Sequence, residues 1–167
     1  MSINHFEYRY GYLASHYPLS IVFAGRIYPS AENLYWSILY PDLAEKCSYL
    51  PDASIDDRLH VMSANEAGII GTRRQIDAVK HNRAMIIHPS VQIEAMRLAT
   101  SLKFKQHPNF KEKLMSTKQQ LVYTNTCDDR FWGMSPDEDG HLVGQNNLGK
   151  ILMELRKQYL KEAKETA

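Results

Sequence analysis

Tyr28-Pro29-Ser30-Ala31-Glu32-Asn33 is the stretch of this sequence that predicts most about the fold. A proline followed by a serine is a common start signal for a helix, with the serine as its N-cap. Counting Ser30 as the N-cap places Glu32 in the first helical turn, where free backbone N–H groups and the helix dipole favour an ionised carboxylate. We therefore expect Glu32 to be a fixed anion on a rigid element. The alternative is that this glutamate only caps the helix.

The elements on either side of this stretch are predicted from turn and breaker signals. The helix itself is expected to span residues 31–39 and to stop at Pro41. Before it, the apolar runs on both sides of Ala24-Gly25 predict a hairpin that ends at Tyr28. The rest of the segment 6–28 is expected to be extended with turns.

The region after this helix has fewer periodic signals. Residues 41–63 contain prolines and an acidic cluster, so we expect a variable surface loop. The capping box Ser63-Ala64-Asn65-Glu66 predicts a short helix that begins at 64 and ends near Gly71. The pair Arg73-Arg74 is then expected at a turn, where it is either solvated or in contact with a phosphate.

The second half of the chain is predicted to be mainly helical. Ser90 is expected to cap a helix that ends at Pro108, and a short helix follows from Asn109. A strand is expected at Leu121-Val122-Tyr123. The residues expected to be buried on the helix after Ser90 are Val91, Ala95, Leu98 and Leu102.

A long C-terminal helix is predicted after a loop over residues 127–143. Asn146 or Asn147 is expected to cap it. Together with the earlier elements, it predicts an α+β fold: a mostly helical single domain over 1–167, with its core at 6–160 and a small antiparallel sheet. The residues expected on the apolar face of the last helix are Leu148, Ile151, Leu152, Leu155 and Tyr159.

The composition is that of an ordinary soluble globular protein, with 44% hydrophobic and 23% charged residues. A formal net charge of +1 argues against a bulk attraction to nucleic acid or membranes. The cysteines, Cys47 and Cys127, and the scattered histidines show no spacing typical of a metal site. Since there is neither a leader-like segment nor a run of membrane-spanning length, we expect a cytoplasmic protein that binds no metal.

A glycine-spaced segment, Gly144-Gln145-Asn146-Asn147-Leu148-Gly149, precedes the C-terminal helix. Free N–H groups at a helix N-terminus bind anions such as phosphate. A glycine in the first turn also lets a ligand approach the backbone closely. An ordinary N-cap with a tight turn explains the same pattern, so this segment alone leaves both interpretations open.

Several segments, taken in order, resemble the NADAR family, the YbiA-like N-glycosidases. That family shows a Pro-Ser/Thr-x-Glu-His stretch that opens a helix, an Ala-Lys-Phe-x-Gln motif, a Trp-Gly pair and a final Gly-x-Asn-x-Leu-Gly run. The ordered set, rather than any one motif, is specific, and it covers residues 10–160. The matching segments of this sequence are Tyr12–Pro18, Tyr28–Asn33, Leu102–Gln106, Leu114–Thr117, Leu121-Val122, Trp132-Gly133 and Gly144–Arg156.

The resemblance implies a hydrolase that breaks the N-glycosidic bond of a ribose-containing nucleotide derivative without a cofactor. Family members act on ADP-ribose-type compounds or on ribosylaminopyrimidine phosphates, which are intermediates of riboflavin synthesis. The implied partner is therefore a small ribonucleotide, or an ADP-ribosyl group attached to a macromolecule such as a nucleic acid. The rival interpretation is a module that binds ADP-ribose or a related nucleotide without turnover.

The resemblance also implies roles for individual residues. Cleavage of the bond develops positive charge on the ribose ring, which the Glu32 carboxylate would stabilise while it orients the attacking water. Trp132 is expected to stack on the base or ribose, and Lys103 to contact a phosphate unless it is an ordinary solvated lysine. The remaining residues expected to contact substrate are Tyr28, Ser30, Asn33, Gly133, Asn146 and Gly149.

The sequence departs from the family pattern around the first motifs. Asn33 stands where the family usually has His, immediately after Glu32. Ser15 stands where the family has Asn, and His16 where it has an aromatic residue. These departures give weight to the rival interpretation of a binding module.

A further departure concerns the leaving group. Met134 follows Trp132-Gly133, where many family members place an Asp. If that acid assists the leaving group, the nearby run Asp137-Glu138-Asp139 must replace it, or the substrate must assist its own cleavage. We therefore take Asp137 and Asp139 as further catalytic candidates.

Overall fold

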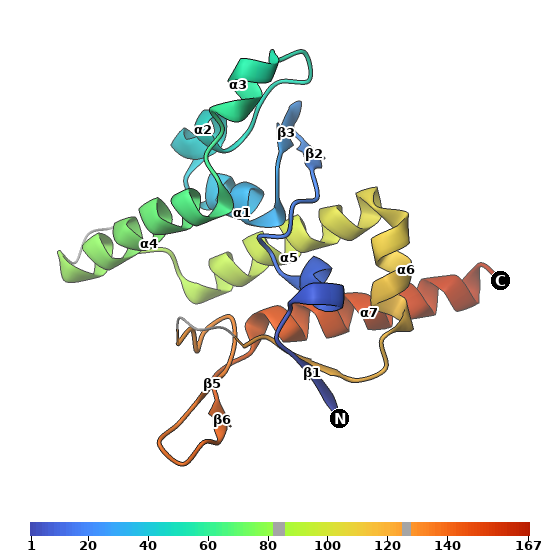
Figure 1. The fold of residues 1–167 in the computed structure, drawn as a ribbon. Helices are drawn as coiled ribbons and strands as arrows, with labels where there is room; N and C mark the ends of the chain where they lie inside the picture. The colour runs from blue at the N-terminus through green and yellow to red at the C-terminus, as the bar shows by residue number, and fades with distance from the viewer. Residues whose placement is uncertain (82–85, 125–127) are drawn as a thin grey trace. The chain divides into compact units, whose positions relative to one another are not determined.

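Helices dominate the computed structural model, which describes residues 1–81, 86–124 and 128–167 (Figure 1). The described residues also form three two-stranded sheets, two of them antiparallel and one parallel. The chain divides into two compact units, Ser15–Gln106 and the combination of Met1–Ala14 with His107–Ala167. The predicted α+β class, with a predominance of helix, is confirmed.

The hairpin predicted before the first helix is present. Strands β2 (Ile21–Phe23) and β3 (Arg26–Tyr28) pair antiparallel, with Phe23 opposite Arg26. The two residues between them, Ala24 and Gly25, both have positive φ. This conformation matches the twist of the paired strands, and it explains why the turn contains a glycine.

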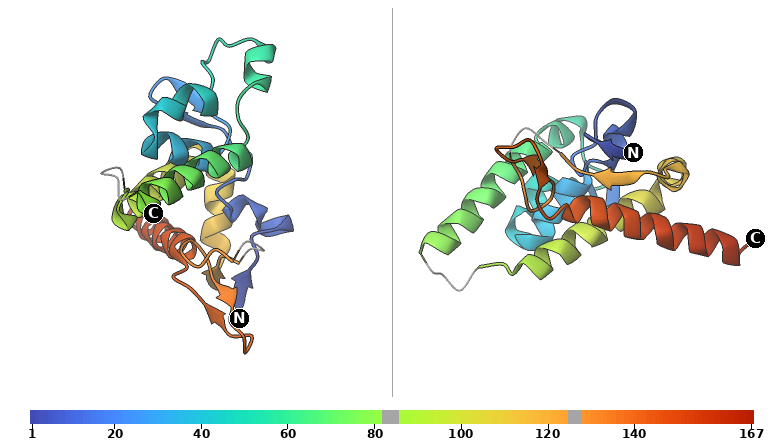
Figure 2. Two further views of the ribbon diagram at one scale, coloured as in Figure 1. Left: turned by 90° about the vertical axis from the view of Figure 1, so that its left-hand side faces the viewer. Right: turned by 90° about the horizontal axis from the view of Figure 1, so that it is seen from below.

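Helix α1 (Ala31–Leu39) has the predicted bounds and forms the centre of its unit. It packs against both α4 (Ala64–Lys80) and α5 (Pro89–Gln106), which can be followed in Figures 1 and 2. The side chains buried on α1 are Ala31, Asn33, Leu34, Tyr35, Trp36 and Ser37.

Helix α4 is longer than the sequence predicts. It begins with the expected capping box at Ser63 but continues to Lys80, so Arg73 and Arg74 lie within the helix and not at a turn. Gly71, where the helix was expected to end, is buried inside it. A Cβ atom at this position would lie 2.1 Å from the Trp36 ring. The absence of a side chain at Gly71 therefore allows α4 to pack closely against Trp36 of α1.

The region 41–63 is more ordered than the loop that the sequence predicts. It contains a 3-10 turn at Pro41–Leu43, helix α2 (Ala44–Cys47) and helix α3 (Ile55–Leu59). A capping box begins α3, in which the Ser54 hydroxyl accepts a hydrogen bond from the Asp57 backbone N–H. The acidic cluster thus starts a helix because its serine and aspartates satisfy free N–H groups.

Two residues predicted to be buried on α5 are exposed. Val91 is 52% and Leu98 41% exposed, and the helix begins at Pro89, which places Ser90 in the first turn. The true buried face lies further around the helix and includes polar side chains that a hydrophobic pattern does not count. Its members are Ala95, Met96, Ala99, Thr100, Lys103 and Phe104.

The other unit is built on the C-terminal helix α7 (Asn147–Glu165). The predicted apolar face is confirmed, since all five of its residues from Leu148 to Tyr159 are buried. Strand β4 (Gln120–Val122) packs against this helix and pairs in parallel with β1 (Ser2–Asn4). No local pattern predicts that pairing, because it joins distant parts of the chain.

Shorter elements complete this unit. Helix α6 (Pro108–Ser116) follows the predicted course, whereas residues 8–13, expected to be extended, form a 3-10 helix. The predicted loop over 127–143 contains a small hairpin of β5 (Ser135–Pro136) and β6 (Leu142–Val143). Cys127, at the start of that loop, lies outside the described residues.

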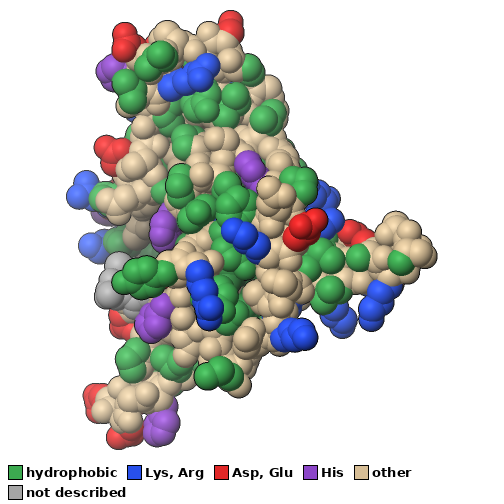
Figure 3. All heavy atoms as spheres, turned by 45° about the vertical axis from the view of Figure 1, so that its right-hand side comes forward, with side chains coloured by type: hydrophobic (Ala, Val, Ile, Leu, Met, Phe, Trp, Pro, Cys, Tyr) green, Lys and Arg blue, Asp and Glu red, His purple; other side chains and the backbone are tan. Residues whose placement is uncertain are grey.

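The surface carries both signs of charge. On the face shown in Figure 3, basic and acidic side chains are interspersed with hydrophobic and polar ones, in agreement with the net charge of +1. Of the helices in the described ranges, none combines the length and the apolar character needed to cross a membrane.

Candidate functional site

Glu32 occupies the first turn of α1, as predicted. Ser30 is the N-cap, and its Oγ accepts a hydrogen bond of 3.1 Å from the Asn33 backbone N–H. Glu32 is the second residue of the helix, and its side chain is half-buried. The N-terminal end of the helix dipole stabilises negative charge at this position.

Ser15 holds the Glu32 carboxylate from a segment 17 residues earlier in the chain. Its Oγ donates a hydrogen bond of 3.0 Å to Oε2, and its carbonyl oxygen accepts one of 3.0 Å from the Glu32 backbone N–H. Ser15 is only 8% exposed. Sequence reasoning noted this serine as a departure from the family pattern, and no local signal pointed to its contact with the carboxylate.

The other carboxylate oxygen of Glu32 faces helix α4. A Cβ atom at Gly68 would lie 3.3 Å from Oε1 of Glu32 and 3.6 Å from Nε1 of Trp36. Trp36 follows Glu32 by one helical turn and is 6% exposed. Its indole N–H is buried and has no hydrogen-bond acceptor among the described residues. A carboxylate oxygen and a hydrogen-bond donor therefore both lie against one glycine.

The Trp36 ring is part of a stack of three side chains, with Tyr40 and Arg74. The Tyr40 ring lies nearly parallel to it, with centroids 6.3 Å apart, and the Arg74 guanidinium lies 5.1 Å from the Tyr40 centroid. Arg74 also makes two hydrogen bonds of 2.8 Å to Asp42, which hold the pKa of that carboxyl below its usual value. Arg74 thus binds a carboxylate of its own chain, in place of the solvation or phosphate contact considered from the sequence.

Three predicted substrate contacts are buried, and two of them, Ser30 and Asn33, are hydrogen-bonded to each other. Tyr28, Ser30 and Asn33 are between 1% and 4% exposed. The Ser30 hydroxyl donates to Asn33 Oδ1 at 2.6 Å, and Asn33 Nδ2 donates to the Met62 carbonyl oxygen at 2.7 Å. The hydrogen bond from Asn33 to Met62 therefore links the start of α1 to the segment before α4.

Lys103 is buried in α5. Its side chain is 0% exposed, so the alternative of an ordinary solvated lysine is wrong. Burial lowers the pKa of the ammonium group to about 7, and Nζ lies 5.2 Å from the Phe104 ring centroid. A substantial share of the Lys103 side chains is therefore uncharged at neutral pH.

In the other unit, Asn146 and Gly149 contact the backbone of β4. Asn146 accepts a hydrogen bond from the Tyr123 N–H through Oδ1 and donates one from Nδ2 to the Leu121 carbonyl oxygen, both at 2.9 Å. A Cβ atom at Gly149 would lie 2.3 Å from that same carbonyl oxygen. The Leu121 carbonyl oxygen therefore occupies the space next to Gly149 into which a ligand was expected to come. Asn146 is the N-cap residue, but its side chain makes no capping hydrogen bond.

Trp132 lies in a turn organised by Asp129, whose Oδ1 accepts hydrogen bonds from the backbone N–H groups of Phe131 and Trp132. The indole meets the Phe131 ring edge-on, with centroids 4.8 Å apart, and remains half-buried. Gly133 follows, where a Cβ atom would lie 2.4 Å from the Tyr123 carbonyl oxygen. Sequence reasoning missed Asp129, although an aspartate that opens a turn is a known signal.

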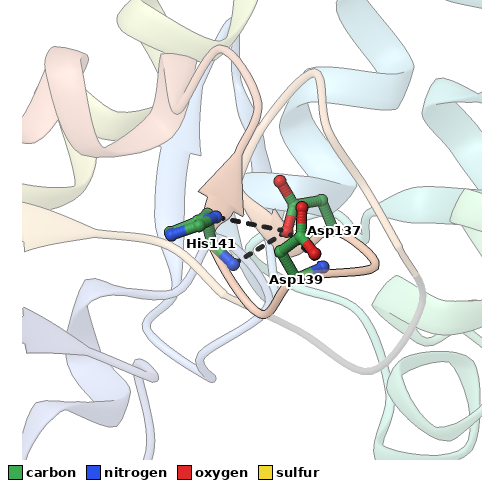
Figure 4. Close-up of side chains that lie close together, drawn as sticks. All are labelled: Asp137, Asp139 and His141. Atoms are coloured by element: carbon green, nitrogen blue, oxygen red, sulfur yellow. Dashed lines mark hydrogen bonds and ion pairs between the residues drawn. The ribbon is translucent and has the colours of Figure 1, made fainter.

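Asp137 and Asp139 lie with His141 in the turn between β5 and β6 (Figure 4). Oδ1 of Asp137 accepts hydrogen bonds from the backbone N–H groups of Asp139 and His141, at 3.0 and 2.8 Å. One ligand atom of each residue lies within 4.8 Å of the others, so this group is spaced closely enough for a cation. The backbone hydrogen bonds already account for the position of the Asp137 carboxylate.

The comparisons with known proteins agree on one family. A family model described as "NADAR domain" matches residues 4–160. A riboflavin biosynthesis protein of Vibrio vulnificus is 30% identical over 156 residues, which make up 92% of this chain and 37% of that protein. The N-glycosidase YbiA of Escherichia coli is 39% identical over 69 residues, 41% of each chain. The matched regions thus span less than half the length of these two relatives.

A solved structure shares the fold. The NMR structure of the Escherichia coli protein YbiA superimposes with a TM-score of 0.65 and 24% sequence identity. The superposition covers 98% of this chain and 88% of the other. At this identity the likeness shows the architecture alone, in agreement with the α+β fold expected from the sequence.

Proposed function

The chain belongs to the NADAR domain family, and from this premise we propose that it hydrolyses the N-glycosidic bond of a ribose-containing nucleotide derivative. One observation carries the proposal: the Glu32 carboxylate is fixed at the start of α1 by the Ser15 hydroxyl. The names of its relatives, an N-glycosidase and a riboflavin biosynthesis protein, support the same class of reaction.

The reaction replaces a C–N bond by a C–O bond. As the bond from ribose C1′ to nitrogen breaks, its electron pair goes to the nitrogen and positive charge develops on the ribose ring. Glu32 stabilises that charge through its carboxylate and accepts a proton from the water whose oxygen attacks C1′. The leaving nitrogen takes up a proton in turn, and we keep Asp137 and Asp139 as candidate donors for it.

A fixed carboxylate suits this role better than a mobile one. Preorganised charge stabilises a transition state because little reorganisation is needed when the reaction occurs. The helix start and the hydroxyl donor on Oε2 both favour negative charge on Glu32. We therefore assign it the role of an electrostatic stabiliser and general base, and not that of a general acid.

Two observations support the proposed substrate class. The relative named for riboflavin biosynthesis favours a ribosylaminopyrimidine phosphate. The resemblance to the NADAR family adds ADP-ribose-type compounds, free or attached to a nucleic acid. Trp132 remains the proposed contact for the base. Lys103 remains the proposed phosphate contact, and because its side chain is 0% exposed, neighbouring side chains must move for a phosphate to reach it.

Product analysis by chromatography tests the proposal. The purified chain is incubated with ribosylaminopyrimidine phosphates, NAD-like compounds and ADP-ribosylated nucleobases, next to a Glu32→Gln variant. We expect wild type to release the amine or base from at least one of them, and Glu32→Gln to be at least 100-fold slower, about 3 kcal/mol in the barrier. Asp137→Asn and Asp139→Asn are assayed in parallel. Equal rates for wild type and Glu32→Gln would remove Glu32 from the mechanism.

A non-catalytic ADP-ribose-binding module is the second candidate. Met134 in place of the usual acid, and Asn33 in place of the usual histidine, favour it. Calorimetric titration with ADP-ribose separates the two functions. Binding of ADP-ribose, without release of base or amine from any of the compounds, would establish the module.

A further inference from the structure

Helix α4, labelled in Figure 1, has one buried and one exposed face. The buried residues are all small, and the helix packs with them against its own unit: Ala67, Gly71 and Ala78. The large apolar side chains lie on the other side of the helix. Ile69, Ile76 and Val79 are 45%, 48% and 65% exposed. The apolar residues of α4 with the most surface to bury are thus the ones that the monomer leaves in solvent.

The exposed apolar residues follow a regular spacing. They belong to a row of exposed residues separated by steps of four, three, four and three: Asn65, Ile69, Thr72, Ile76 and Val79. Single apolar residues scattered over a surface need no explanation. A row with this alternation, however, is the contact line of one helix packed along another. We call these five residues the α4 seam.

The charges beside the α4 seam indicate the direction of a second helix. Glu66 follows the first seam residue and Lys80 follows the last, so both lie on the same side of the seam. The Glu66 carboxylate is held in place by a hydrogen bond of 2.7 Å from the Ser63 backbone N–H. In an antiparallel pair of α4 helices, each Glu66 meets the partner's Lys80, whereas a parallel pair does not bring these opposite charges together. Arg73, between them, has Asp77 four residues later to offset its charge.

We propose that the α4 seam is the contact surface for a second copy of this chain, with the two α4 helices packed antiparallel about a twofold axis. A surface that pairs with itself in this way is complementary in both shape and charge. Ile69 then packs against Val79 of the partner subunit, and Thr72 against Ile76 of the partner subunit. One pair of helices is a small interface, so the dimer is reversible and forms in the micromolar range. The inference does not depend on the proposed catalytic activity.

Sedimentation velocity over a series of protein concentrations tests the proposal. We expect wild type to shift reversibly from monomer to dimer as the concentration rises. Ile76→Lys places a charge in the middle of the α4 seam, so we expect the dissociation constant to rise at least about tenfold. Leu98→Lys is the matched control, because Leu98 is an apolar residue of α5 with a similar exposure of 41%. Its dissociation constant should stay within about twofold of that of wild type.

Exchange of the two charges makes the test specific. Lys80→Glu and Glu66→Lys, each alone, place like charges together twice in the dimer, so we expect each variant to associate about threefold to tenfold more weakly than wild type. In an equimolar mixture of the two variants, the mixed dimer again has opposite charges at both places. We therefore expect the mixture to associate more strongly than either variant does. A mixture with no gain over the separate variants would contradict the proposed contact.

Disulfide trapping tests the antiparallel direction. In a Cys127→Ser background, Ile69→Cys and Val79→Cys are mixed under mild oxidation. We expect the mixed disulfide to form faster than the disulfide of either variant with itself, since like positions lie about 15 Å apart along the axis. Faster linkage of each variant with itself would mean a parallel pair and would overturn the arrangement. A wild type that stays monomeric at high micromolar concentration, or an Ile76→Lys variant that dimerises as wild type does, would overturn the proposal itself.

Discussion

The Ser15 hydroxyl donates a hydrogen bond of 3.0 Å to the Glu32 carboxylate, and the Glu32 backbone N–H returns one of 3.0 Å to the Ser15 carbonyl oxygen. This pair of bonds joins the segment before the hairpin to the start of α1. It fixes both the carboxylate and the backbone that carries it. Ser15, which departs from the family pattern, thus makes a direct hydrogen bond to the candidate catalytic group.

Removal of the Ser15 hydroxyl tests this relationship. A hydrogen bond to an ionised group contributes about 1.5–3 kcal/mol, so we expect Ser15→Ala to lower kcat roughly tenfold or more. Ser15→Thr keeps the hydroxyl and should retain most of the activity. Ser90→Ala, at an exposed serine, is the control. Unchanged turnover in Ser15→Ala would show that the bond does not position the carboxylate.

Gly71 is expected to be intolerant of any side chain. A Cβ atom there would lie 2.1 Å from Cε3 of Trp36, so Gly71→Ala must push α4 away from α1 or displace the ring. Overpacking of this kind costs about 1–3 kcal/mol, which exceeds the gain in helix propensity. Thermal unfolding followed by circular dichroism should show a lower Tm for Gly71→Ala than for Gly68→Ala. The reverse order would contradict the packing of the two helices.

Lys103 predicts a pH dependence of stability. Burial lowers the pKa of its ammonium group to about 7 in the folded chain, whereas an unfolded lysine titrates near pH ~10.4. Between these values the unfolded chain binds more protons, so the free energy of unfolding rises with pH. Below about pH 7 both states are protonated, and the cost of burying the charge is complete.

The matched variants are Lys103→Met and Lys105→Met. From pH 7 to 9.5 we expect wild type to gain about 3 kcal/mol relative to Lys103→Met, at about 1.4 kcal/mol for each pKa unit. Lys105 is exposed, so Lys105→Met should follow wild type. Denaturant unfolding at a series of pH values measures the difference. Parallel curves for wild type and Lys103→Met would mean that the buried lysine does not titrate in this range.

Trp132 is expected to act in binding. Stacking of a base on an aromatic side chain contributes about 1–3 kcal/mol, so Trp132→Ala should weaken binding of an ADP-ribose-type ligand roughly tenfold, whereas Trp132→Phe should keep most of it. Phe131→Ala changes the neighbouring ring in the same turn and serves as the control. Titration calorimetry gives the affinities. An equal loss in the two alanine variants would point to the turn as a whole and not to the indole.

Local sequence signals predicted those parts of the fold that depend on neighbouring residues. The N-cap at Ser30, the hairpin turn at Ala24-Gly25 and the apolar face of α7 are each encoded within a few residues. The same reasoning misjudged the end of α4, because Gly71 looks like a helix stop until the Trp36 ring is seen against it. It also misplaced the buried face of α5, since a fully buried lysine such as Lys103 does not register in a hydrophobic pattern.

By itself, the sequence determined that a carboxylate stands at the start of a helix in a chain of the NADAR family, because capping residues and ordered motifs are local features. Only the tertiary structure decided which residues lie next to Glu32: Ser15, whose hydroxyl donates to Oε2, and Gly68 of α4, which lies against Oε1. These partners lie 17 residues before Glu32 and on a different helix. Their contacts exist only once the chain has folded and the core has brought α4 against α1.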